Sequence, residues 1–330
     1  MRSFRRSLAV VVAASALLVA ASLLVGHGDL GDGALRATFV ELRATRAAAA
    51  FLSGAALAIG GLVLQTLFRN PLVDPSILGT TSGASLGGQL AIVAFQLAPG
   101  RLRPAFLVPE MVLPIGCLVG ALVSLAILLA VIRQTQSELA VLLTGFLLSS
   151  LFLSAGALLV SLAQDSWELG RAVVSFTLGG VGGAGSRHVL LGLPLVLAAL
   201  VALWCWARPL EVLLSGEDEA NTLGVDVPQV RFWTVVWVAV GTAAAVAIGG
   251  NVGFVGLIVP HALRPLVGIS PRRLLPVAAI AGGAFVVLCD MAVRAAPFRG
   301  ELPLGVITGL VGGPLFLILV LRSQRAAARA

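Results

Sequence analysis

The stretch that decides the fold is residues 47–68, AAAAFLSGAALAIGGLVLQTLF, which holds no charged residue. A helix needs about 20 apolar residues to cross the hydrocarbon core of a bilayer, so this stretch is long enough to span one. Arg43 and Arg46 precede the stretch and Arg69 follows it. Charge at both ends of an uncharged run is typical of a helix that leaves a membrane on either side.

Similar runs fill the rest of the chain. Of the 330 residues, 58% are hydrophobic and 11% are charged, and the mean hydropathy is +1.04. A soluble domain carries roughly twice that charged fraction. We therefore predict an all-α polytopic membrane protein, one domain over residues 1–330 with about ten transmembrane helices. The predicted spans lie near residues 7–26, 47–68, 76–97, 106–132, 139–163, 188–207, 232–250, 254–268, 275–296 and 303–321.

The orientation follows from the arginines, which make up all 22 basic residues. An even number of spans puts both termini on one side. With that side in the cytoplasm, thirteen arginines fall in cytoplasmic segments and nine fall outside. Cytoplasmic loops carry the excess of basic residues in membrane proteins, so both termini are predicted to be cytoplasmic. The first run follows Arg2, Arg5 and Arg6 and is longer than a secretory signal needs, which favours an uncleaved span.

A weak internal repeat is also present. Residues 56–61, ALAIGG, resemble residues 245–250, AVAIGG, and residues 69–73, RNPLV, resemble residues 264–267, RPLV. Five predicted spans separate the copies, so the copies would run in opposite directions. Inverted repeats of this kind are common in transporters.

Two predicted spans carry glycines at every fourth position, which places each trio on one helix face. Such faces let helix backbones approach closely in a membrane. Packing within one subunit, a subunit interface and a smooth pathway wall all remain open. The trios are Gly79, Gly83 and Gly87, and Gly305, Gly309 and Gly313.

The most polar segment is residues 215–224, SGEDEANTLG. Ser215 followed by Asp218 resembles a capping box, and acidic residues suit the first turn of a helix. Gly224 can end the helix. We predict a short cytoplasmic helix, which is either an ordinary solvated loop helix or a docking element for a cytoplasmic partner.

Charge is nearly absent from the predicted spans. Asp290 is the main exception, and Arg294 lies four residues later, where the two can pair on one helix face. An ion-coupled carrier usually needs buried carboxylates. No GxxxxGK[ST] motif, metal-ligand spacing or catalytic constellation occurs in the sequence. The sequence therefore predicts that the protein is not an enzyme and that it holds no cofactor and no metal ion. The alternatives are an ion-coupled secondary transporter with inverted repeats and, less favoured, an intramembrane enzyme.

The order of several short motifs resembles the FecCD family, the permeases of type II ABC importers for iron-siderophores, haem and cobalamin. The resemblance spans about residues 40–322. The motifs that carry it are residues 42–46 LRATR, 69–75 RNPLVDP, 214–220 LSGEDEA, 253–261 GFVGLIVPH, 301–306 ELPLGV and 312–314 GGP. In the first of these motifs the family often has Leu-Pro between the two arginines, where this chain has Ala44 and Thr45 between Arg43 and Arg46.

The resemblance implies the type II ABC importer fold and a homodimer with two cytoplasmic ATPase subunits and a periplasmic substrate-binding protein. It implies that Arg43, Arg46 and Arg294 meet acidic residues of the binding protein. Asn70 and Leu72 would help to close a cytoplasmic gate, and spans 5 and 10 would line the pathway or the dimer interface. The ATPase would contact Ser215, Gly216, Glu217, Asp218, Glu219, Ala220, Leu223 and Gly224.

The expected cargo is a metal chelate, with a ferric siderophore as first choice and haem or cobalamin as alternatives. Arg171 lies in the predicted outer segment before span 6. It is either an interfacial anchor or a contact for a substrate carboxylate.

Overall fold

The computed structural model describes residues 2–26, 35–97, 109–134, 138–296 and 302–327. This part of the chain forms thirteen helices and contains no β-strand, which confirms the all-α prediction. The helices are α1 (Arg2–Ser22), α2 (Arg36–Leu67), α3 (Thr80–Leu97), α4 (Pro109–Gln134), α5 (Glu138–Ala163), α6 (Trp167–Leu178), α7 (Ser186–Cys205), α8 (Ala207–Leu213), α9 (Glu217–Thr222), α10 (Val227–Gly249), α11 (Val255–Val267), α12 (Pro271–Ala295) and α13 (Leu304–Ala327).

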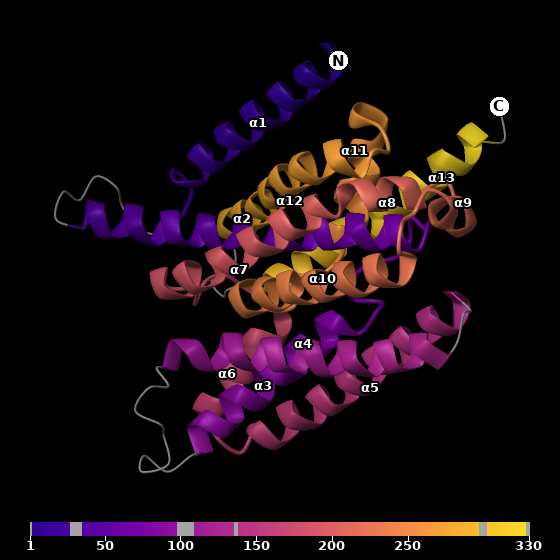
Figure 1. Ribbon diagram of the computed structural model, residues 1–330. Helices are drawn as coiled ribbons and strands as arrows, with labels where there is room; N and C mark the ends of the chain where they lie inside the picture. Colours follow the sequence, from indigo (N-terminus) through magenta and orange to yellow (C-terminus); the bar gives the residue numbers. More distant parts are fainter. Residues whose placement is uncertain (1, 27–34, 98–108, 135–137, 297–301, 328–330) are drawn as a thin grey trace.

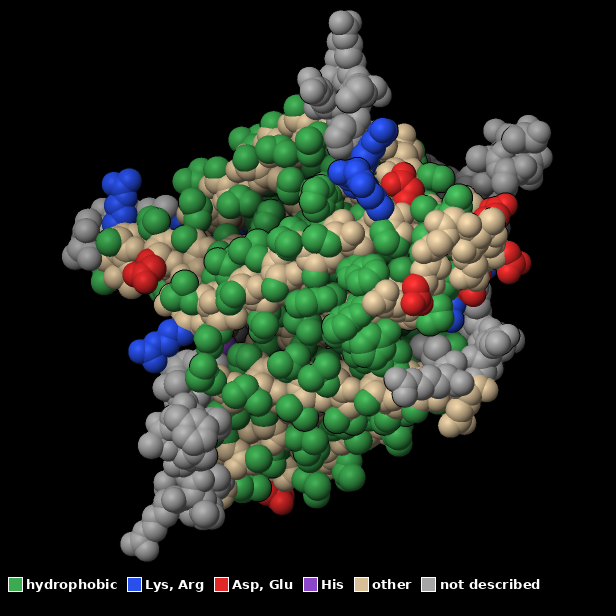
Figure 2. Space-filling view, viewed as in Figure 1, with side chains coloured by type: hydrophobic (Ala, Val, Ile, Leu, Met, Phe, Trp, Pro, Cys, Tyr) green, Lys and Arg blue, Asp and Glu red, His purple; other side chains and the backbone are tan. Residues whose placement is uncertain are grey.

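Six of these helices are long and apolar enough to cross a membrane: α2, α4, α5, α7, α10 and α12. Shorter apolar segments lie in α1, α11 and α13. Figure 2 shows hydrophobic side chains over the middle of one face, with charged side chains mostly towards its left and right ends. Membrane-spanning helices have this distribution because their own backbone hydrogen bonds satisfy the peptide groups while apolar side chains face lipid.

Helix α2 lies at the centre of one group of helices and packs against α7, α10, α11 and α12 (Figure 1). Two glycines make this packing close. A methyl group added to Gly54 would lie 2.2 Å from the Gly282 carbonyl oxygen on α12. A methyl group on Gly61 would lie 2.2 Å from the Gly256 carbonyl oxygen on α11. The backbones of α2, α11 and α12 therefore touch where glycine leaves room for them.

A second group consists of α3, α4, α5 and α6, in the lower half of Figure 1. The α3–α4 contact also depends on glycine. A methyl group on Gly87 would lie 2.1 Å from the Gly116 carbonyl oxygen, and one on Gly120 would lie 2.0 Å from the Gly83 carbonyl oxygen. Helix α10 contacts α2 as well as α3 and α4, so it joins the two groups.

The helices differ from the sequence prediction at α2, α6 and α8. Helix α2 starts at Arg36, well before the apolar run, so its first turns carry charge. Helix α6 falls in the predicted outer segment before span 6, for which no helix was predicted. This helix is short and carries Glu168 and Arg171, yet it buries Leu169 and Val173. The short α8 follows α7 directly and was also not predicted.

Candidate functional site

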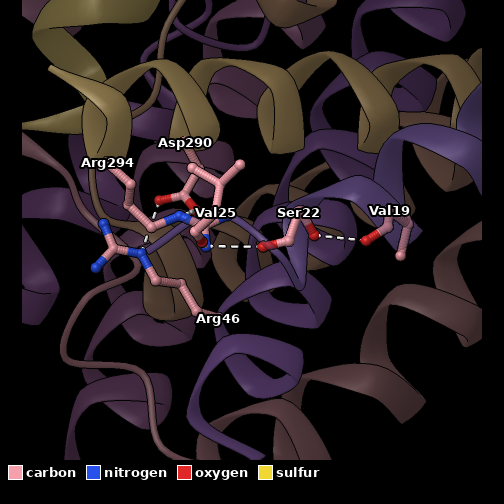
Figure 3. A network of polar contacts seen from close by, with 6 residues as sticks. All are labelled: Val19, Ser22, Val25, Arg46, Asp290 and Arg294. Carbon is pink, nitrogen blue, oxygen red and sulfur yellow. Dashed lines mark hydrogen bonds and ion pairs between the residues drawn. The ribbon is translucent and has the colours of Figure 1, made fainter. Parts of the chain in front are cut away.

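A cluster of charges lies where α2 and α12 pack together, at the Arg46 end of α2 (Figure 3). The Asp290 side chain on α12 is 1% exposed. Its Oδ1 lies 2.8 Å from Arg46 Nε and its Oδ2 lies 2.9 Å from Arg294 Nε. The pairing of Asp290 with Arg294 along one helix face is confirmed. The Arg46 contact joins residues 244 positions apart, and the sequence did not predict it.

Arg43 and Arg294 hold the end of α1. Arg43 Nη1 donates to the Leu23 and Leu24 carbonyl oxygens at 3.0 and 3.3 Å, and its Nη2 donates to the Gly26 carbonyl at 3.1 Å. Arg294 Nη1 donates to the Ser22 carbonyl oxygen at 2.9 Å and also to that of Val25 (Figure 3). The last carbonyls of a helix lack partners within the helix and attract cations. Both arginine side chains are buried beneath the end of α1 that they bind.

Arg46 also lines a pocket together with Arg171. The pocket has a volume of about 310 Å³ and lies between α2, α6 and the start of α13. The Arg46 side chain is 23% exposed, and Arg171 is exposed on α6. The remaining lining residues are Val174, Ser175, Leu178, Gly179, Gly180, Gly182, Gly183, Leu302, Pro303 and Leu304. Two guanidinium groups at one pocket favour an anionic group, because they can donate charge-assisted hydrogen bonds to a carboxylate.

Polar side chains also connect α2 to α11, nearer the Arg69 end of α2. Gln65 is buried, and its Nε2 donates to the Gly256 carbonyl oxygen at 2.8 Å. Arg264 Nη2 donates to Gln65 Oε1 at 2.7 Å. Pro260 lies four residues after Gly256 and has no N–H, so the Gly256 carbonyl lacks its helical partner. Gln65 supplies that partner from another helix. Gln65 lies in the stretch 47–68, Pro260 in the motif 253–261 and Arg264 in the internal repeat, but the sequence did not predict this contact.

The loop after α2 contains the two residues proposed for a gate. Asn70 Oδ1 accepts a hydrogen bond from the Leu72 N–H at 2.9 Å, which fixes a tight turn. The Leu72 side chain is 46% exposed, while Val73 beside it is buried. The turn therefore presents an apolar side chain at the Arg69 end of α2.

Helix α2 ends in a Schellman motif. The Arg69 N–H bonds the Thr66 carbonyl at 3.2 Å and the Asn70 N–H bonds the Gln65 carbonyl at 3.1 Å. Arg69 occupies the left-handed position, with φ of 46°, where glycine is usual. A side chain in this conformation costs roughly 1–2 kcal/mol.

Helix α9 differs in detail from the helix predicted over residues 215–224. Gly216, not Ser215, is its N-cap, and no side chain caps it, so the capping-box prediction is wrong. Gly216 has φ of +131°, which directs the chain into the helix without Ser215 reaching its N–H groups. The predicted end at Gly224 is confirmed: the Gly224 and Val225 N–H groups bond the Asn221 and Ala220 carbonyls in a Schellman motif.

Charges hold α9 in place and also face away from it. Glu217 pairs with Arg231 on α10 at 2.6 Å. Asp218, Glu219 and Leu223 are exposed, whereas Ala220 is buried against the protein. The helix therefore presents an acidic surface with one exposed leucine.

The two glycine trios lie in different surroundings. Gly79 precedes α3 with φ of +81°, while Gly83 and Gly87 face the α4 backbone within the same subunit. On α13, Gly305 lies against the Asn251 and Leu178 carbonyls. A methyl group on Gly309 would meet nothing within 4 Å, and one on Gly313 would lie 3.9 Å from the Phe254 ring.

In the described part of the chain, no three His, Cys, Asp or Glu residues lie close enough together to hold a metal ion. The arrangements that the described residues do form are a charged cluster, an arginine-lined pocket, an exposed turn and an acidic helix. Each of them presents charged or apolar groups that can contact a partner.

Comparison with known proteins adds three relatives. The model of the FecCD transport family matches residues 5–322. The cobalamin import system permease BtuC of Halobacterium salinarum is 40% identical, covering 81% of this chain and 69% of its own. The Fe(3+) dicitrate transport system permease FecD of Escherichia coli is 36% identical, covering 86% and 85%. The hemin transport system permease HmuU of Yersinia pestis is 34% identical, covering 87% and 84%.

The fold is also similar to that of a solved structure, described as an inward-facing conformation of a metal-chelate type ABC transporter. The two agree with a TM-score of 0.82 and 30% sequence identity, over 96% of this chain and 99% of the other. The similarity therefore covers nearly the whole chain and every helix group described above.

Proposed function

The chain belongs to the FecCD transport family, so it is a multi-pass membrane permease of an ABC transporter and not itself an enzyme, and from that premise we propose that it imports a metal chelate. The family match over residues 5–322 carries this proposal. In it, a periplasmic binding protein delivers the chelate, two copies of this chain form the pathway, and two cytoplasmic ATPase subunits drive the transport. Both termini of the chain lie in the cytoplasm.

The cargo is a ferric siderophore by first choice, with haem or cobalamin as alternatives. Relatives named for cobalamin, ferric dicitrate and hemin lie between 34% and 40% identity, so identity does not choose among them. The Arg46–Arg171 pocket supports a cargo or partner that carries carboxylates.

The Arg46 end of α2 is proposed to dock the binding protein through Arg43, Arg46 and Arg294. The contacts of the three give them different roles in this proposal. Arg46 is partly exposed and can meet an acidic residue directly. Arg43 and Arg294 are buried and position the surface by holding α1.

This difference sharpens the docking test. Arg46→Gln is expected to weaken docking of the binding protein while the permease stays folded, because Asp290 keeps its contact with Arg294 and no second carboxylate is placed beside it. Arg36→Gln, the same charge change on the exposed first turn of α2, is the control. Docking that is equally strong in Arg46→Gln and in the wild type would remove Arg46 from the docking surface.

The Arg69 end is proposed to contain the cytoplasmic gate and the ATPase contact. Leu72 would meet its copy in the second subunit and close the pathway, and Asn70 would hold it in place. The acidic α9 would sit in the ATPase. The second subunit would cover apolar faces of α5 and α13, whose exposed residues include Leu147, Leu151, Leu158, Leu310 and Leu317.

An ion-coupled secondary transporter is the alternative. That mechanism needs a carboxylate free to bind and release an ion within the membrane. Asp290 is held by two arginines instead, at 2.8 and 2.9 Å. This observation favours the ATP-driven importer.

The test is vanadate-sensitive ATPase activity of the permease, co-purified with its ATPase in lipid nanodiscs. The binding protein is added after loading with ferric siderophore, haem or cobalamin in separate trials. Stimulation by one loaded form is expected and would identify the cargo. If no ATPase associates and uptake follows an ion gradient, the secondary transporter is the correct description.

A further inference from the structure

The residue at the end of α2 is unusual for its position. Arg69 occupies the left-handed position of a Schellman motif, with φ of 46°. The same motif at the end of α9 uses Gly224, with φ of +80°. The chain turns with positive φ at glycine after α10 and α11 as well, at Gly250 and Gly268. Arg69 and Phe254 are the two non-glycine residues with positive φ in the described residues. A strained residue of this kind points to a role for its side chain.

The Arg69 side chain reaches the start of α9. A methyl group on Gly216 would lie 3.9 Å from Arg69 Nη1 and 3.8 Å from Glu219 Oε2. The guanidinium and the carboxylate therefore flank the same point, directly before the first turn of α9. In the same first turn of α9, Glu217 pairs with Arg231 of α10 at 2.6 Å.

The two arginines connect α9 to different parts of the protein. Arg231 belongs to α10 and anchors α9 to the helix bundle. Arg69 begins the turn that presents Leu72, through the Asn70 side chain. Its guanidinium lies beside the start of α9, so a displacement of α9 can act on the turn through it.

We propose that Arg69 is a positioning residue that transmits movement of α9 to the turn at residues 69–73, because its guanidinium lies beside the acidic start of α9. This inference rests on the proposed function, in which α9 receives the movement of the ATPase and the turn forms the gate. The proposed link runs from Glu219 to Arg69 and then along the backbone to Leu72.

The experiment uses the complete complex of permease, ATPase and binding protein in proteoliposomes. The cargo is whichever of ferric siderophore, haem or cobalamin stimulates the wild-type complex. Arg69→Gly is the decisive variant because glycine fits the left-handed position better than arginine does. It removes the side chain without harming the end of α2. The readouts are cargo transported per ATP hydrolysed, ATPase rate, and thermal stability of the permease.

We expect Arg69→Gly to be as thermally stable as the wild type and to assemble with the ATPase. Cargo transported per ATP should fall about fivefold or more, the usual lower size of a coupling effect. Cargo transported per ATP should also fall in Glu219→Gln. It should equal the wild-type value in Glu211→Gln, which changes an exposed residue of α8. The exchanged pair Arg69→Glu with Glu219→Arg should recover at least part of the loss.

Wild-type transport per ATP in Arg69→Gly would overturn the inference, and so would an exchanged pair no better than Arg69→Glu alone. Failure of the proposed function looks different. In that case the wild-type permease would not assemble with an ATPase, and no variant would be needed to detect it.

Discussion

Replacing Asp290 with asparagine isolates the energetic role of the charged cluster. Asparagine has nearly the same shape as aspartate, so the packing of α12 is kept while the negative charge is lost. Arg46 and Arg294 then face each other without the carboxylate that lies 2.8 and 2.9 Å from them. The Arg294 side chain is 4% exposed, so water cannot replace the lost partner.

Removing one partner of a buried ion pair costs about 3–5 kcal/mol. We expect the lower half of that range, because Arg294 keeps its bonds to the Ser22 and Val25 carbonyls and Arg46 is partly exposed. A loss of this size corresponds to a fall in Tm of roughly 5–10 °C in a chain of this length. Glu41→Gln, an equal charge change at an exposed site on α2, should change stability by less than about 0.5 kcal/mol.

The assay is thermal unfolding in detergent or nanodiscs, followed by circular dichroism at a fixed heating rate. A double-mutant cycle with Arg46→Gln completes it. Because Arg46 and Asp290 contact each other, the double variant should lose less stability than the two single losses added together, by about 1 kcal/mol or more. A Tm of Asp290→Asn within 1 °C of the control, in repeated measurements, would refute the reasoning that this carboxylate neutralises two arginines.

Two further predictions test packing and titration. Gly61→Ala should destabilise the protein by about 2–3 kcal/mol, because its methyl group would lie 2.2 Å from the Gly256 carbonyl oxygen. Gly309→Ala, which has open space around it, should be nearly neutral. Equal Tm values for the two variants would contradict the close α2–α11 contact. Burial raises the pKa of the Asp74 carboxyl in the loop after α2, so folding favours its neutral form. The stability that this preference contributes is present below the unfolded pKa of about 4, and it is lost as pH rises through the folded pKa. Asp74→Asn should therefore lower the pH dependence of Tm above pH 4, and an unchanged profile would show that Asp74 is not the titrating group.

The sequence predicted those features of this fold that depend on local pattern. Apolar runs predict membrane helices because a helix must satisfy its own backbone in lipid. The pairing of Asp290 with Arg294 follows from four-residue spacing, and the end of α9 follows from Gly224. In each case the partners lie within one turn of a helix, so the local geometry fixes the contact.

Contacts between distant helices could not be predicted in this way. Arg46 pairs with Asp290 because Gly54 lets α2 approach α12, and no pattern within either helix contains that information. The close glycines of α2, Gly54 and Gly61, are seven residues apart, so a search for four-residue spacing missed them. Pro260 was a usable signal, since a proline in a helix frees the carbonyl four residues earlier and a buried amide elsewhere must then be sought.

The position of α2 limits how the protein can change its conformation. One helix carries the charged cluster at one end and Arg69 at the other, and between them its backbone touches those of α11 and α12. Packed contacts of this kind do not stretch or bend gradually. Movement at the Arg69 end must therefore carry α2, α11 and α12 together, and the yielding contacts are those with α3–α6, which reach this group mainly through α10. A tilt of one helix group against the other is the expected motion, because it moves the Leu72 turn while leaving the buried ion pairs of Asp290 intact.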